Sequence, residues 1–137
     1  LVSAHAFGLS ETPISPWLPY GIYTIPEISM VGQTEKELTE AGVPYEFGIA
    51  RYREIARGQI IGDRTGLLKL LVHAENRKIL GVHILGEGAT ELIHIGQMAL
   101  ALGGTLDILV ENVFNYPTLA ECYKVAALNA YNKLINS

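Results

Sequence analysis

The segment LLKLLVHAENRKILGVHIL, residues 67–85, decides the fold. Its first and last seven residues, 67–73 and 79–85, are rich in leucine, isoleucine and valine, and these residue types fit β-strands when turn residues bound them. The run Glu75-Asn76-Arg77-Lys78 between them is polar and typical of a turn. The segment therefore predicts an antiparallel β-hairpin.

A long helix is predicted directly after the hairpin, over residues 89–102, and Gly103-Gly104 ends it. At about 100° per residue its apolar side chains cover an arc of roughly 200°, about twice the stripe that a surface helix needs. These side chains are Leu92, Ile93, Ile95, Met98, Ala99, Leu100 and Leu102, and His94 and Gln97 share the opposite side. One sheet face cannot bury so wide an arc. Either another helix of this chain covers the remainder or a second subunit does, and the C-terminal helix with Val125, Leu128 and Leu134 is the internal candidate.

Shorter elements surround this centre. Strands are predicted at 21–23, 27–31 and 45–52, a short helix at 105–110, and a loop or bulge at 51–62. Capping boxes predict two more helices, one starting at Thr34 with Glu37 and one over 118–132 starting at Thr118 with Glu121. Strands and helices come in blocks around a hairpin. The predicted fold class is therefore α+β, an antiparallel sheet with helices packed on it.

The N-terminal residues predict a domain boundary. Residues 1–7 look like the end of a helix that Gly8 stops, and residues 10–19 carry three prolines, which favour an extended linker. Because the chain opens on Leu1 rather than methionine, we expect it to be part of a longer protein. We predict residues 1–16 to be the end of a preceding domain with its linker, and residues 17–137 to be one domain.

Composition and charge exclude several classes of protein. The chain has 137 residues, of which 49% are hydrophobic, enough to fill a core, so disorder is excluded. A net charge of −4 gives no electrostatic support for nucleic-acid binding. We find no signal peptide, and the most apolar helix is too short to span a bilayer. The single cysteine points to a reducing compartment, so we expect a soluble, cytoplasmic protein with neither nucleic-acid nor membrane partners.

Three motifs invite functional interpretations that the residues support poorly. Gly86-Glu87-Gly88 follows a strand and opens a helix, as a dinucleotide-binding loop does, but Glu91 stands where the third glycine belongs. Glu91 and His94 have a metal-ligand spacing, but only one copy is present, so we predict no metal site. The arginines between residues 51 and 64 favour a solvated face or an inter-domain ion-pair region.

The sequence from Tyr20 to Leu134 resembles the C-terminal dimerisation domain of the flavin-dependent pyridine nucleotide–disulfide oxidoreductases. Residues 21–28 (GIYTIPEI) are similar to that domain's entry strand, and Val31-Gly32 with Thr34-Glu35 to its first turn and helix. Residues 80–86 and 89–102 match its hairpin strand and interface helix. The resemblance covers more than four-fifths of the 137 residues. It implies the dimerisation-domain fold and a homodimer. It also implies a preceding flavin-binding domain, of which residues 1–16 are the end with its linker.

One short motif carries what the resemblance implies about the site. In this family the stretch reads His-Pro-Thr-x-x-Glu, and its histidine and glutamate reach the partner subunit's flavin and redox cysteines. Here Pro117, Thr118 and Glu121 match, but Tyr116 replaces the histidine. Tyrosine titrates near ~10 and histidine near ~6.5, so Tyr116 would be a poor base for thiol–disulfide chemistry. The resemblance then leaves Glu121 mainly a helix cap, a catalytic role for it being only an option, and places Tyr116 and Pro117 against the partner's FAD.

The pattern Asn115-Tyr116-Pro117-Thr118 is similar to that of family members that pass hydride from NADPH to NAD through FAD and need no thiol base. The resemblance therefore implies that the full-length protein is an oxidoreductase of that kind, with FAD as cofactor and NAD(P) as substrate. The glycine-rich FAD and NAD(P) loops would belong to other domains, so this part alone is expected to be inactive.

Two alternatives remain open from the sequence. The chain could be the same domain of a dihydrolipoamide-dehydrogenase-like disulfide reductase with a substituted base, which a Cys-x4-Cys pair upstream would favour. It could also be a stand-alone module that self-associates and has no enzyme attached.

Overall fold

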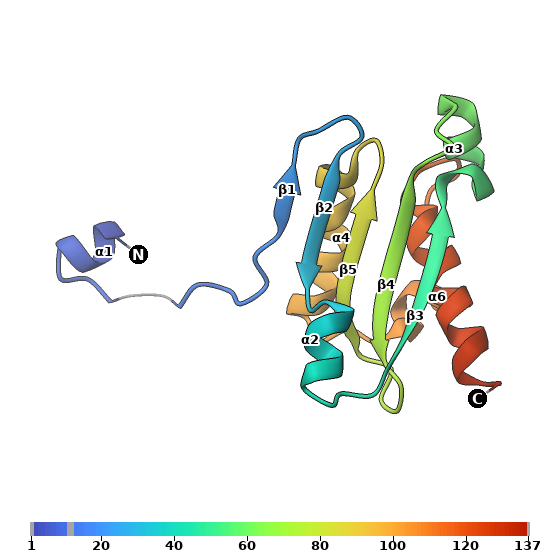
Figure 1. The fold of residues 1–137 in the computed structure, drawn as a ribbon. Coiled ribbons are helices and arrows are strands. Elements are labelled where there is room, and N and C mark those ends of the chain that lie inside the picture. The colour runs from blue at the N-terminus through green and yellow to red at the C-terminus, as the bar shows by residue number, and fades with distance from the viewer. Residues whose placement is uncertain (1, 11–12, 137) are drawn as a thin grey trace.

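The computed structural model describes residues 2–10 and 13–136. Its elements follow the chain in the order α1 (Val2–Ala6), β1 (Tyr20–Ile22), β2 (Ile28–Gly32), α2 (Glu35–Glu40), β3 (Tyr45–Arg51), a 3-10 turn (Tyr52–Glu54), α3 (Ala56–Ile61), β4 (Leu67–His73), β5 (Ile79–Leu85), α4 (Ala89–Ala101), α5 (Leu106–Glu111) and α6 (Glu121–Leu134) (Figure 1).

The predicted hairpin forms the centre of the fold. Strands β4 and β5 have the predicted bounds and pair antiparallel, with Leu68 opposite Ile84 and Leu70 opposite Val82. In the turn between them Arg77 has a positive φ of 59°, and its guanidinium lies 3.1 Å from the Asp107 carboxylate. The turn is thereby tied to α5.

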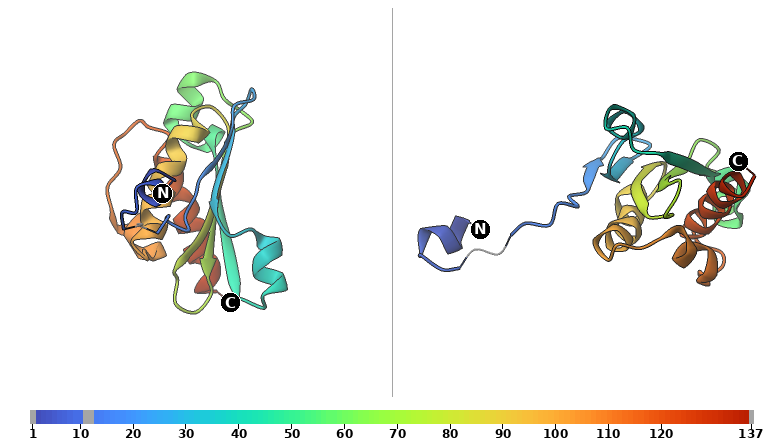
Figure 2. Two further views of the ribbon diagram at one scale, coloured as in Figure 1. Left: turned by 90° about the vertical axis from the view of Figure 1, so that its left-hand side faces the viewer. Right: turned by 90° about the horizontal axis from the view of Figure 1, so that it is seen from below.

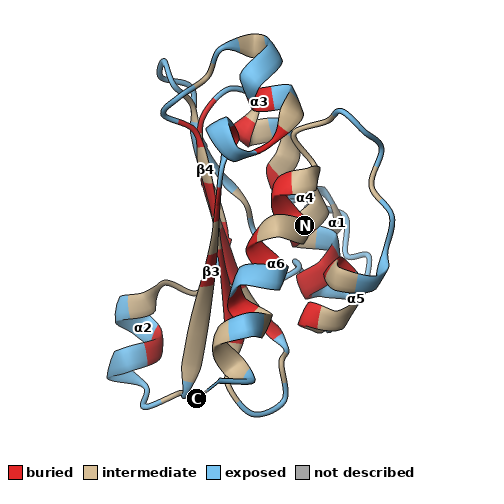
Figure 3. Ribbon diagram, turned by 90° about the vertical axis from the view of Figure 1, so that its right-hand side faces the viewer, coloured by how far each residue is buried: buried red, intermediate tan, exposed pale blue. Residues whose placement is uncertain are grey.

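The sheet has five strands in the order β1-β2-β5-β4-β3, and every pairing between neighbours is antiparallel. Helices α4 and α6 cover one face, α4 over β5 and β2, and α6 over β3 and β4. Figure 2 shows these helices and α5 together on that side of the sheet, and Figure 3 shows α2 on the other side. The α+β class and the antiparallel sheet with packed helices are confirmed.

The core lies between the sheet and this helix layer. It combines the inward side chains of the central strands with the small residues of α6. Its fully buried members include Val31, Leu68, Leu70, Val72, Val82, Ile84, Ile93, Leu106, Cys122, Tyr123, Ala126, Ala127 and Ala130.

Helix α6 approaches the sheet at backbone distance. A Cβ on Gly48 of β3 would lie 1.9 Å from the carbonyl oxygen of Ala126, so only glycine permits this packing. Ala126 and Ala130 are both fully buried. Small residues on both elements therefore fix the distance between α6 and β3.

The structure confirms one predicted capping box and corrects the other. Thr34 and Glu37 form both reciprocal bonds at the start of α2. Helix α6, by contrast, begins at Glu121 and not at Thr118. The Thr118 hydroxyl donates instead to the carbonyl oxygen of Asn115 at 2.7 Å, so it turns towards the preceding loop and does not cap the helix.

The segment predicted as a loop or bulge is partly helical. Residues 51–62 contain the 3-10 turn and α3, and Tyr52 is fully buried. The Tyr52 ring is the contact that a Cβ on Gly66 or Gly86 would meet. A large side chain beneath two glycines thus organises a stretch in which the sequence shows no clear periodicity.

The N-terminal part stands away from the sheet (Figure 1). None of the residues of α1 is buried, and Leu1, part of the predicted helix end, lies outside the described residues. Trp17 is partly buried against the core, and its carbonyl oxygen accepts a hydrogen bond from the Gln97 side chain at 2.9 Å. None of the helices in the described ranges combines the length and the apolar character needed to cross a membrane.

Candidate subunit interface and cross-subunit loop

Helix α4 buries only part of its wide apolar arc. Ile93 and Leu100 are buried, whereas Met98 is 58% exposed and Leu102, just beyond the helix end, is 80% exposed. The sheet accounts for much of the burial, since a Cβ on Gly32 of β2 would meet the Leu100 side chain at 3.1 Å. The fold of one chain therefore leaves an uncovered apolar edge on α4.

The C-terminal helix contacts α4 through a residue that the sequence did not single out. Tyr123 is fully buried. Its hydroxyl accepts a hydrogen bond from the backbone N–H of Gly96 at 3.0 Å and donates one to the carbonyl oxygen of Leu92 at 2.7 Å. Among the three predicted covering residues, Val125 and Leu134 pack partly against the core, whereas Leu128 is 40% exposed.

The loop over residues 112–120 presents Tyr116 to solvent. Tyr116 is 74% exposed and Val113 is 93% exposed. Contacts behind them hold the loop: the Lys124 ammonium donates to the carbonyl oxygen of Asn112 at 3.0 Å, and the Thr118 hydroxyl bonds Asn115 as described above. An aromatic side chain at the tip of an anchored loop is suited to contact another surface.

Glu121 faces this loop from the first turn of α6. Its carboxylate accepts the backbone N–H of Thr118 at 3.4 Å. It also lines a cavity of about 210 Å³ with Val113, Phe114, Lys124, Val125 and Leu128. This cavity lies between the loop and α6 and is walled mainly by apolar groups.

Amides of the Gly86-Glu87-Gly88 turn and of the start of α4 are already hydrogen-bonded, beginning with the Gly86 N–H, which donates to the Glu27 carbonyl oxygen at 2.9 Å. The N–H and the hydroxyl of Thr90 both donate to the Glu27 carboxylate, at 3.0 and 2.7 Å, and these bonds lower the pKa of Glu27. The Glu87 N–H points to Asp63 at 3.4 Å. The start of α4 is therefore capped by acids from neighbouring segments, a contact that no local sequence pattern indicates.

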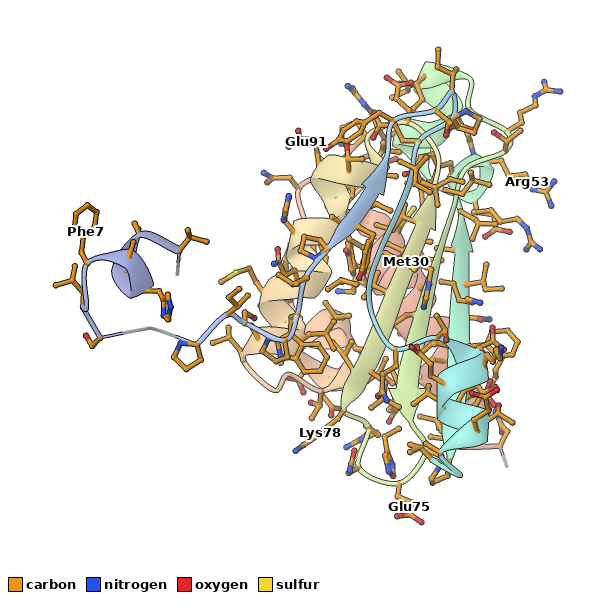
Figure 4. All side chains as sticks on the ribbon, turned by 60° about the vertical axis from the view of Figure 1, so that its left-hand side comes forward. Phe7, Met30, Arg53, Glu75, Lys78 and Glu91 are labelled. Atoms are coloured by element: carbon orange, nitrogen blue, oxygen red, sulfur yellow. The ribbon has the colours of Figure 1, made fainter. Side chains whose placement is uncertain are left out.

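Local contacts account for side chains of the Glu91–His94 pair and of the arginine cluster between residues 51 and 64. The His94 ring lies 2.8 Å from the Gln97 side chain, and Glu91 is exposed near the start of α4 (Figure 4). Within residues 2–10 and 13–136, no group of three or more His, Cys, Asp or Glu side chains could hold a metal ion. Arg53 extends outward at the far end of the sheet (Figure 4), and Arg51 pairs with Glu54 at 3.6 Å.

Two buried groups are unsuited to acid–base or redox work. Burial raises the pKa of the Cys122 thiol to about 12, with a further contribution from Glu121. Burial also raises the pKa of Tyr52, whose hydroxyl donates to the carbonyl oxygen of Glu87 at 3.1 Å. Both side chains are structural.

The chain has a closed core, an uncovered apolar edge on a long helix, and an anchored loop with an exposed aromatic tip. These features are those expected of a domain that contacts a second subunit. Residues 18–127 match the family model described as "Pyridine nucleotide-disulphide oxidoreductase, dimerisation domain". The chain belongs to that family.

Curated relatives with high similarity carry a more specific name. The chain is 57% identical over 134 residues to the soluble pyridine nucleotide transhydrogenase of Mycobacterium bovis (strain BCG / Pasteur 1173P2), covering 98% of this chain and 29% of that protein. It is 56% identical over 120 residues to the protein of the same name from Yersinia pestis (strain Pestoides F), covering 85% of this chain and 26% of that one. The chain thus spans less than a third of the relatives it matches.

Solved structures show the same fold. The HOCl-induced flavoprotein disulfide reductase RclA from Escherichia coli matches with a TM-score of 0.83 and 25% identity, over 93% of this chain and 30% of that one. LpdA from Mycobacterium tuberculosis matches with a TM-score of 0.81 and 24% identity, over 93% of this chain and 28% of that one.

Proposed function

We propose that this chain is the dimerisation domain of a soluble, FAD-dependent pyridine nucleotide transhydrogenase, and that each copy completes the active site of its partner subunit. The identity to proteins of that name over nearly the whole chain is the observation that carries the proposal. Tyr116 supports it, because hydride exchange between nicotinamides needs no thiol base at that position.

The occupant of the uncovered surface is a second copy of this chain. Exposed large apolar side chains lie on all three helices of the helix layer and on the loop between α5 and α6, namely Met98, Leu102, Ile108, Val113, Tyr116 and Leu128. Exposed apolar side chains gathered on one helix layer are typical of a subunit interface. The family description of a dimerisation domain agrees with that occupant.

The residues present suit a contact with a flavin held by the partner. Bound FAD would supply the chemistry, accepting hydride from NADPH and giving it to NAD. Tyr116 is exposed on an anchored loop, so its ring can lie against a flat aromatic group without rearrangement. Pro117 follows it and adds a rigid apolar contact, while Glu121 holds the Thr118 amide and keeps the loop in place.

The division of the chain is part of the proposal. Residues 1–16 would end the flavin-binding domain, and residues 17–137 would form the dimerisation domain. Val2 and Phe7 are 86% and 81% exposed, as expected of a helix that packs against the flavin-binding domain and not against this one. We propose a cytoplasmic location, because the single cysteine is the pattern of a reducing compartment.

The test uses the full-length protein loaded with FAD. Hydride transfer from NADPH to an NAD analogue, together with a dimer in sedimentation velocity, is the expected result. Efficient reduction of lipoamide without transhydrogenation would replace the proposal by a dihydrolipoamide-dehydrogenase-like reductase. A dimer with neither activity would favour a stand-alone module that self-associates and would overturn both enzyme assignments.

A further inference from the structure

The buried hydroxyl of Tyr123 sits between two groups that an α-helix normally joins to each other. Leu92 and Gly96 are four residues apart in α4, so the Gly96 N–H and the Leu92 carbonyl oxygen are a standard intrahelical pair. The Tyr123 hydroxyl bonds both, at 3.0 and 2.7 Å. A polar group inserted into this ladder is a recognised cause of helix bending.

The approach depends on a glycine. A Cβ on Gly96 would lie 3.0 Å from the Tyr123 hydroxyl and 2.6 Å from a methyl group of Val82. Tyr123 is fully buried, so its hydroxyl is removed from bulk solvent, and burial raises its pKa. The contact is therefore a fixed neutral link between the first turn of α6 and the middle of α4.

The same first turn of α6 also anchors the Tyr116 loop. Lys124, adjacent to Tyr123, donates to the Asn112 carbonyl oxygen, and Glu121 accepts the Thr118 amide. On the other side of the link, Met98 lies two residues beyond Gly96 and is exposed. One turn of helix thus touches both the helix that bears the apolar edge and the loop that bears the aromatic tip.

We propose that Tyr123 is a positioning residue, which fixes α4 relative to the Tyr116 loop so that the subunit contact sets where Tyr116 meets the partner's flavin. This inference rests on the proposed function. It adds that the two exposed features are coupled through one buried hydroxyl, and that a dimer lacking the hydroxyl forms but holds Tyr116 less accurately. Small displacements of a contacting group are enough to slow catalysis markedly.

The experiment compares Tyr123→Phe with Tyr131→Phe in the full-length, FAD-loaded protein. Tyr131 lies on the same helix, is partly buried against the core, and has a hydroxyl for which no hydrogen bond is found in the described part of the chain. We expect Tyr123→Phe to remain a dimer, to lower kcat for transhydrogenation about three-fold or more with little change in KM, and to change the flavin fluorescence. Tyr131→Phe should change neither.

A second variant tests the same link if Tyr123→Phe folds poorly. Lys124→Met removes the link from α6 to Asn112 without touching the core, and we expect the same change in flavin fluorescence with a nearly unchanged Tm. If Tyr123→Phe lowers the Tm but leaves flavin fluorescence and kcat equal to those of Tyr131→Phe, the inference is overturned and Tyr123 is purely structural. Those outcomes are read in an active dimer, so they differ from failure of the proposed function, in which the parent protein itself lacks transhydrogenation.

Discussion

Helices α4 and α6 use their small and apolar residues in opposite ways. On α6, Ala126 and Ala130 are fully buried against β3, and Gly48 lets the backbones meet. On α4, Met98 remains exposed on the edge away from the sheet. Helix α6 completes the fold of one chain, whereas α4 has apolar surface left over, and that remainder is where we propose that a second copy binds.

Adding one methyl group between β3 and α6 should have the largest effect on stability. Gly48→Ala places a Cβ within 1.9 Å of the Ala126 carbonyl oxygen, so α6 must move off the sheet. We expect a loss of about 3 kcal/mol in the free energy of unfolding, measured by urea unfolding. Gly42→Ala is the matched control: it has a positive φ but open space around it, so a smaller loss of about 1 kcal/mol is expected. Equal losses would show that α6 does not sit tightly on β3.

Placing charges on the exposed apolar edge of α4 should separate the subunits without unfolding them. Met98→Asp with Leu102→Asp puts two carboxylates on the α4 edge, and burying them in an interface is unfavourable. We expect the dimer Kd of the full-length protein to rise about 100-fold or more, equivalent to about 2.7 kcal/mol, in sedimentation velocity.

Ile60→Asp provides the control for added surface charge, because Ile60 is also exposed, at 64%, but lies on α3. Dimers of unchanged Kd in the Met98 and Leu102 variant would place the interface elsewhere.

The acid that caps α4 should have a smaller, pH-dependent effect. The Thr90 bonds lower the pKa of Glu27 below its ordinary value of 4.5. Its stabilising contribution is therefore complete above that value and is lost as the pH falls through the lowered pKa. We expect Glu27→Gln to cost about 1 kcal/mol at pH 7 and to differ less from the parent once the pH falls below the lowered pKa of Glu27.

Urea unfolding across pH 3–7 measures this difference, with Glu91→Gln in the same first turn as the control. A penalty for Glu27→Gln that does not shrink at low pH would assign its role to shape and not to charge.

The smallest gain or loss of function on restoring the family residue concerns position 116, where tyrosine replaces the family's histidine. Restoring histidine with Tyr116→His should not raise transhydrogenation by more than about two-fold, because hydride exchange requires no base there. Steady-state kinetics of the full-length enzyme measure this, with lipoamide reduction followed in parallel. A large gain in transhydrogenation would mean that position 116 has a catalytic role.

Local patterns predicted the parts of the fold that local forces determine. The hairpin bounds were correct because apolar runs flank a polar turn, and the Thr34–Glu37 capping box forms because its residues are neighbours. The start of α6 was wrong because the Thr118 hydroxyl has a competing acceptor at Asn115. That competition depends on the path of the loop and is invisible in the spacing of Thr118 and Glu121.

The candidate site was predictable in outline but not in its contacts. The wide apolar arc of α4 indicated that one sheet face could not bury it, yet it left open what covers the remainder and could not show that Leu100 turns to the sheet while Leu102 stays exposed. The links from Tyr123 to Gly96 and from Glu27 to Thr90 join residues 27 and 63 positions apart. Such pairings arise only when the chain has folded.

The most direct test asks whether Tyr116 of one subunit lies beside the flavin of the other. Tyr116→Trp in the full-length, FAD-loaded protein, read as the difference in fluorescence from the parent, reports this proximity through quenching by the flavin. We expect strong quenching in the dimer and its release when Met98→Asp and Leu102→Asp separate the subunits at unchanged flavin content. Equal fluorescence of Trp at position 116 in dimer and monomer would contradict a site shared between subunits.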